Sequence, residues 1–208
     1  MATAGYEQRV SLWDVRDPRQ PAHQVDIDTG DPYHLAFSPD GHSLGISSDE
    51  RSNTASLWDI GDPKQPVKLS SLVGHTDSVY AICFSPDGRV VATSSVDSTT
   101  MLWDVTDRSH PTRLAVLSAH VGPVNSAVFA PDGKRLVALG DDGTTIWVVK
   151  SRSQLTPLDA GLSGQYFQEA MFAQKAPLRL SGVPTDRPRP LYRRSGPSCF
   201  RLETPSFR

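Results

Sequence analysis

The 208-residue chain contains two cysteines, Cys83 and Cys199, and no CxxC pair. This scarcity excludes a disulfide framework and a cysteine-based metal site, so a reducing, cytoplasmic setting is expected. The sequence also has no run of about 18 apolar residues, the length that a membrane-spanning helix requires. Its first residues lack the apolar segment of a signal peptide.

Catalytic signatures are missing as well. The chain has no G-x-S-x-G elbow, phosphate-binding loop, H-E-x-x-H helix or G-x-G-x-x-G turn. Positive charge is scarce in residues 1–173, which sum to −8, whereas residues 174–208 sum to +6. An acidic body is a poor partner for a phosphate backbone. We therefore expect no enzyme activity, no cofactor or metal, and neither a specific nucleic acid nor a membrane as partner.

The sequence instead contains internal repeats, marked by three motifs in one register. The Leu-Trp-Asp motif ends at Trp13-Asp14, Trp58-Asp59 and Trp103-Asp104, and a decayed fourth copy has Trp147. Phe-Ser-Pro-Asp-Gly or a near copy begins at Phe37, Phe84 and Phe129, and a proline-containing segment follows each Trp-Asp. A period of about 45 residues predicts a repeat architecture.

Each unit is predicted to form four short β-strands. In the best-preserved repeat these strands cover residues 79–84, 89–93, 99–103 and 113–117. Ser-Pro-Asp-Gly is a turn between the first two strands, because proline presets φ, aspartate bonds to nearby backbone and glycine accepts a positive φ. The Asp-Pro-x-x-Pro segment is a loop before the fourth strand, since its prolines cannot donate to a sheet.

A Gly-His pair near the start of such a unit and Trp-Asp near its end resemble the WD40 family of β-propellers. The resemblance covers about residues 1–150 and is greatest to long arrays of bacterial signalling proteins. It implies an all-β propeller region over residues 1–173, followed by a basic, disordered tail over 174–208. The region divides into a partial blade at 1–29, repeats at 30–73, 74–118 and 119–162, and a degenerate strand at 163–173.

In the family, a histidine, a serine or threonine, an aspartate and a tryptophan form a structural tetrad in each blade. Only one repeat carries all four, as His75, Thr93, Asp97 and Trp103. The preceding repeat has Gly30 and Ile46 at the first two positions. The next repeat keeps His120 and Trp147 but has Ala138 in place of the hydroxyl. Thr3 occupies the strand position of the hydroxyl residue in the partial blade.

These repeats are too few for a seven-bladed ring, so we expect an incomplete propeller. The alternative is a four-bladed ring in which residues 165–173 supply the inner strand missing from residues 1–28. An open arc is expected to self-associate to complete the propeller.

The leading functional hypothesis is a non-catalytic protein-interaction scaffold, part of a larger array. Alternatives are a sensor or regulatory module beside an NTPase, kinase or protease, and a propeller enzyme. The family implies partner contacts on the face formed by the loops that precede each first strand and the loops between the second and third strands. The candidate partner-binding residues are Tyr33, Arg51, Ser78, Tyr80 and Asn125.

Overall fold

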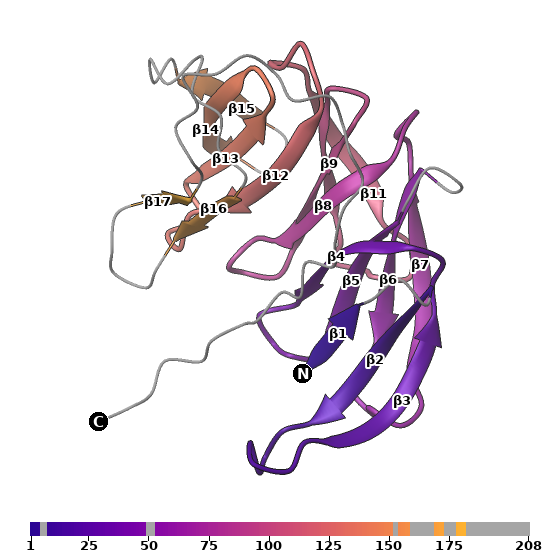
Figure 1. The fold of residues 1–208 in the computed structure, drawn as a ribbon. Coiled ribbons are helices and arrows are strands. Elements are labelled where there is room, and N and C mark those ends of the chain that lie inside the picture. Colours follow the sequence, from indigo (N-terminus) through magenta and orange to yellow (C-terminus); the bar gives the residue numbers. More distant parts are fainter. Residues whose placement is uncertain (5–7, 49–52, 152–153, 159–168, 173–177, 182–208) are drawn as a thin grey trace, which may run out of the picture.

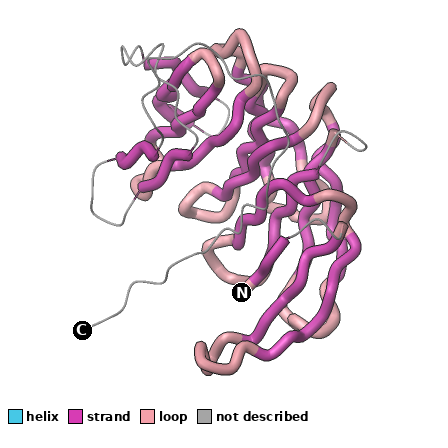
Figure 2. The backbone as a smooth tube through the Cα atoms, viewed as in Figure 1, coloured by secondary structure: helices cyan, strands magenta, loops and turns pink. Residues whose placement is uncertain are grey.

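The computed structural model describes residues 1–4, 8–48, 53–151, 154–158, 169–172 and 178–181. In these ranges every regular element is a β-strand, and Figure 2 shows strands joined by loops. None of the described residues belongs to a helix that could cross a membrane. The all-β fold class predicted from the sequence is therefore confirmed.

The strands form antiparallel sheets that follow the repeats (Figure 1). The first blade has three strands: β1 (Ala2–Ala4), β2 (Arg9–Asp14) and β3 (Ala22–Asp28). The second blade contains β4 (Pro32–Phe37), β5 (Ser43–Ser48), β6 (Thr54–Asp59) and β7 (Val67–Val73). The third blade contains β8 (Val79–Phe84), β9 (Val90–Ser95), β10 (Thr100–Asp104) and β11 (Thr112–Leu117). The fourth blade contains β12 (Val124–Phe129), β13 (Arg135–Gly140), β14 (Gly143–Ser151) and β15 (Gln154–Leu158).

The Ser-Pro-Asp-Gly turns connect the first two strands of these blades. In the third blade, the Ser85 hydroxyl donates to Asp87 at 2.6 Å and accepts the backbone N–H of Val90 at 2.9 Å. Gly88 has a φ of 69°, a conformation that costs a residue with a Cβ more than it costs glycine. The side chains and the glycine thus close the turn that the sequence predicts.

The hydrophobic core lies between neighbouring blades. Val10 and Leu12 of the first blade pack with Leu44 and Ile46 of the second. Two further clusters join the second blade to the third and the third to the fourth. Strands β4, β8 and β12 are neighbours in space along one side of the sheets (Figure 1). Each repeat therefore buries its apolar face against the next repeat, as in other repeat proteins.

A polar contact also links the second and third blades. The guanidinium of Arg108, between β10 and β11, donates to Asp40 at 2.7 Å and to the Ser43 hydroxyl at 3.0 Å. The Ser70 hydroxyl donates to the Arg108 carbonyl at 2.7 Å. These bonds fix the turn of one blade against the loop of the next.

The first and last sheets are incomplete. Strand β1 pairs with β2, while β16 (Glu169–Phe172) lies near β12 and pairs with β17 (Leu178–Ser181). The described part of residues 165–173 thus does not complete the first blade, which contradicts the four-bladed ring. Strand β17 also corrects the prediction of disorder for residues 178–181, and residues 182–208 lie outside the described ranges.

Candidate functional site

The third blade contains a continuous hydrogen-bonded chain of four side chains. The His75 ring lies 2.8 Å from Asp97 through Nδ1 and 2.8 Å from the Thr93 hydroxyl through Nε2. The Trp103 indole N–H donates to the same hydroxyl at 2.9 Å. Both ring nitrogens of a buried histidine are thus satisfied, which avoids the cost of an unpaired polar group. The structure brings together all four residues of the expected tetrad.

Asp97 is the ionisable end of this chain. Burial raises the pKa of its carboxyl group, but hydrogen bonds from Thr99, from the Thr76 backbone and from His75 outweigh burial, so the pKa lies below its ordinary value. The carboxylate is therefore ionised near neutral pH and accepts the proton on Nδ1 of His75. This arrangement locks a loop to a strand, and the side chains of His75 and Asp97 are 0% and 7% exposed.

The first two blades hold their tryptophans differently. In the first blade the Trp13 indole donates to the Thr3 hydroxyl at 2.9 Å, which repeats the bond of Trp103 to Thr93. In the second blade the Trp58 indole donates to Ser56, two residues earlier on the same strand, at 2.9 Å. The sequence analysis did not predict Ser56 as the acceptor for Trp58. The signal that could have indicated it is a serine two residues before the tryptophan.

The fourth blade keeps only half of the tetrad contacts. His120 lies 2.6 Å from Asp142 through Nδ1, and Asp142 also accepts the Val121 backbone N–H at 2.7 Å. Within the described ranges, Nε2 of His120 and the indole nitrogen of Trp147 are buried and have no hydrogen-bond partner. Ala138 stands where Thr93 stands in the third blade, so it offers no hydroxyl to either atom.

Three equivalent residues occupy bulges at the start of the inner strands. The strand register skips Tyr33 in β4, Tyr80 in β8 and Asn125 in β12. Such a bulge re-aims its extra side chain relative to the sheet. The Tyr33 and Tyr80 rings meet edge to face, with centroids 5.0 Å apart. The bulges were not predicted from the sequence, and they place one residue per blade in a row.

The other candidate partner-binding residues differ from this pair. Ser78 is only 2% exposed, and its carbonyl accepts the Val96 backbone N–H at 3.0 Å. Asn125 is half-buried and donates to Asp141 at 2.8 Å. Tyr33 is 43% exposed and Tyr80 is half-buried. Arg51 lies outside the described residues.

The end of the blades that carries this row is negatively charged. We call it the tyrosine end, and it comprises residues 28–34, 73–80, 95–99, 118–125 and 140–143. These segments contain six aspartates and neither lysine nor arginine. The loops at the opposite end contain Arg16, Lys64, Arg89, Arg108 and Lys134. Those loops also contain aspartates such as Asp62, Asp87 and Asp132, so they are of mixed charge, whereas the described segments of the tyrosine end are acidic.

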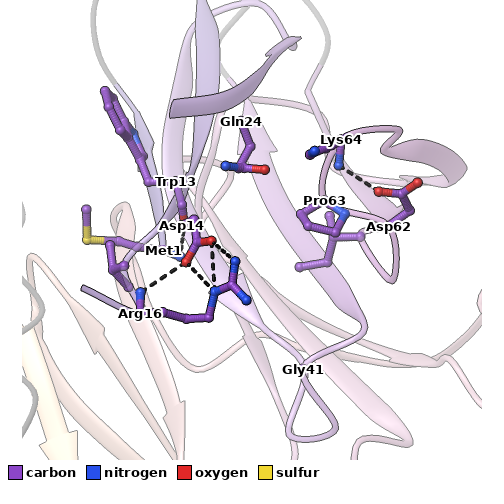
Figure 3. Close-up of a pocket in the computed structure, with 11 residues that line it drawn as sticks. Met1, Trp13, Asp14, Arg16, Gln24, Gly41, Asp62, Pro63 and Lys64 are labelled. Carbon is purple, nitrogen blue, oxygen red and sulfur yellow. Dashed lines mark hydrogen bonds and ion pairs between the residues drawn. The ribbon is translucent and has the colours of Figure 1, made fainter. Parts of the chain in front are cut away.

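A broad groove of about 810 Å³ lies at that opposite end, between the first and second blades (Figure 3). One ion pair lies in its lining. The Arg16 guanidinium donates to Asp14 at 2.6 Å and lowers the pKa of that carboxyl to about 2. The Asp62 carboxylate accepts the Lys64 backbone N–H at 3.0 Å. These contacts form no nucleophile-and-base set.

The described residues show no other constellation with chemistry. No group of three histidine, cysteine, aspartate or glutamate side chains among them could hold a metal ion. Cys83 is partly buried against the core between the third and fourth blades, and burial raises the pKa of its thiol to about 12. Its thiolate is therefore negligible at neutral pH.

Four-stranded blades packed side by side define a repeat protein of the β-propeller type. Residues 66–104 and 111–147 match the family model described as WD domain, G-beta repeat, or WD40. These two segments are therefore WD40 repeats. No curated protein matches the sequence. WD40 repeats are associated with protein-interaction scaffolds, and this coarse role agrees with the repeat fold.

Proposed function

We propose that the chain is a non-catalytic protein-interaction module that binds its partner at the tyrosine end. The observation that carries the proposal is the contact between Tyr33 and Tyr80 across two blades. Each ring stands on a bulge, and the two rings form one amphipathic surface across the second and third blades. Tyrosine supplies large contact area at low entropic cost, which suits a binding anchor.

Charge indicates the chemistry of the partner. The six aspartates of the tyrosine end would attract a cationic segment and repel an acidic one. An arginine guanidinium also stacks favourably on a tyrosine ring. We therefore propose a partner that presents an arginine-bearing extended segment to Tyr33 and Tyr80.

The test is a calorimetric titration of the full chain with an octapeptide of alternating arginine and serine. The Tyr33→Ala/Tyr80→Ala variant is expected to bind about tenfold more weakly, because two exposed cation–π contacts are lost. Phe37→Ala is the matched control, since Phe37 is a similarly exposed aromatic residue (38%) at the far end of the strand that carries Tyr33. A glutamate-containing octapeptide should not bind.

Two outcomes would contradict the proposal. One is equal loss of binding in the Phe37→Ala control, which would place the contact elsewhere or indicate general destabilisation. The other is unchanged binding in the double tyrosine variant. Circular dichroism of each variant separates a loss of contact from a loss of fold.

A second proposed role is self-association through the incomplete blades. Strand β1 forms an edge of the first sheet, and exposed edges of this kind pair readily with another chain. Strand β16 of a second copy would supply an inner strand to β1, which gives a head-to-tail contact. Light scattering at several protein concentrations tests this role. A mass that rises with concentration supports it, and a constant monomer mass overturns it.

A further inference from the structure

The third blade has a side-chain hydroxyl that the fourth blade lacks, and this difference affects two neighbouring side chains. In the third blade the Thr93 hydroxyl joins Trp103 to His75, with distances of 2.9 and 2.8 Å. In the fourth blade Ala138 takes the position of Thr93. Both residues stand two positions after the residue that pairs with the tryptophan of the neighbouring strand. Trp147 and His120 are both retained. The indole nitrogen of Trp147 and Nε2 of His120 lack a hydrogen-bond partner among the described residues.

The two orphaned atoms are chemically complementary. The Trp147 indole nitrogen is a donor only. Asp142 is ionised, because hydrogen bonds from His120 and Val121 outweigh burial and lower its pKa, so it accepts the proton on Nδ1 of His120. In the tautomer that carries its proton on Nδ1, the ring presents Nε2 as an acceptor. By the shared register, this donor and this acceptor correspond to the two groups that the Thr93 hydroxyl joins in the third blade.

We propose that a single buried water molecule binds beside Ala138 and bridges Trp147 to His120. The water would accept the indole N–H and donate to Nε2, which reproduces both bonds of the Thr93 hydroxyl. The side chain of His120 is 4% exposed and Trp147 is 7% exposed. Leaving both atoms dry would forfeit two buried hydrogen bonds.

Thr145 is the competing partner within the chain. It stands two residues before Trp147, the position from which Ser56 accepts the Trp58 indole N–H. In the structure the Thr145 hydroxyl is not bonded to Trp147, whose indole nitrogen has no partner in the described part of the chain. Any test must therefore separate a bound water from this hydroxyl.

The experiment is a water-selective nuclear Overhauser measurement on the indole N–H of Trp147. It is made on the Thr145→Val variant, which removes the neighbouring exchangeable hydroxyl. We expect a water cross-peak at Trp147 in that variant. The cross-peak should vanish in Thr145→Val/Ala138→Val, because the added valine fills the site with a methyl group. Absence of the cross-peak in Thr145→Val overturns the proposal.

A stability comparison gives an independent readout. Threonine and valine have similar volumes, so Ala138→Thr and Ala138→Val differ mainly in a hydroxyl at the water position. We expect Ala138→Thr to unfold at a higher urea midpoint than Ala138→Val, since its hydroxyl replaces both water bonds. Equal midpoints would show that Trp147 and His120 do not engage a hydroxyl-sized group, which would also overturn the proposal.

Discussion

The rings of Tyr33 and Tyr80 meet at an interplanar angle of 71°, with their centroids 5.0 Å apart. One residue comes from β4 and the other from β8, and both are the extra residue of a bulge. The contact joins two blades at their tyrosine end. The segments that make up this end contain six aspartates and neither lysine nor arginine. Regular packing of the repeats thus produces a surface feature that neither blade has alone.

The two tetrad histidines are expected to differ in their contribution to stability. His75 has side-chain partners on both ring nitrogens, whereas His120 has a side-chain partner on only one among the described residues. His75→Ala should lower the free energy of unfolding by about 2–4 kcal/mol, and His120→Ala by about 1–2 kcal/mol. Urea unfolding of both variants measures the difference. Equal losses would show that the missing hydroxyl at Ala138 has no energetic effect.

Asp97 is expected to make stability depend on pH. The pKa of its carboxyl group is lower in the folded chain than in the unfolded chain. In the unfolded chain an aspartate has a pKa of about 3.9. The folded state then binds fewer protons, so the stabilisation is present above about pH 5 and lost as pH falls through the folded-state pKa. Asp97→Asn should be less stable than the wild type at pH 7, and the gap should narrow toward pH 3. A difference in stability between Asp97→Asn and the wild type that stays constant from pH 7 to pH 3 would contradict this role of Asp97.

Gly45 is expected to be required for the packing of the second blade on the third. A Cβ at this position would lie 2.7 Å from Cδ1 of Ile82 and 3.3 Å from the Phe84 ring. Gly45→Ala should cost about 1–3 kcal/mol through crowding. Ile82→Val removes the Cδ1 atom, so the double variant should lose less stability than the sum of the single variants. Strict additivity in urea unfolding would mean that these two residues are not in contact.

Gly140 should be similarly restricted, but within the fourth blade. A Cβ there would lie 2.5 Å from Nδ1 of His120 and 2.7 Å from Oδ1 of Asp142. Gly140→Ala should therefore displace the histidine from the carboxylate and lower the melting temperature. In the His120→Ala background the same change should cost much less, because the clashing ring is gone. A loss of the same size in both backgrounds would place the strain elsewhere.

The sequence predicts the strands and the tetrad positions well because both depend on local patterns with a fixed period. The predicted strand at residues 79–84 coincides with β8, and the predicted turns lie at the Ser-Pro-Asp-Gly motifs. Ala138 was recognisable as a missing hydroxyl from its register together with the tetrad that the WD40 resemblance implies. These features require only that neighbouring repeats adopt the same fold.

Other features could not be read from the sequence. The equivalence of Tyr33, Tyr80 and Asn125 was predicted, but a bulge inserts one residue into a strand without changing the residue types. Only the pairing register shows that each of the three is the extra residue of a bulge. Ser78 is buried although it is a polar loop residue, and its residue type gives no warning of this. Side-chain contacts between blades, such as Arg108 with Asp40, span 68 positions and carry no periodic signal.

The most direct test of the tyrosine end as a binding surface is a nuclear magnetic resonance titration of the full chain. Ring protons of Tyr33 and Tyr80 and the indole N–H of Trp13 are followed while the arginine–serine octapeptide is added. Trp13 lines the groove at the opposite end and serves as the internal reference. The account predicts saturable shifts of both tyrosines, weakened by salt because the attraction is partly electrostatic, with Trp13 unchanged. Shifts confined to Trp13, or no saturable shift of either tyrosine, would contradict it.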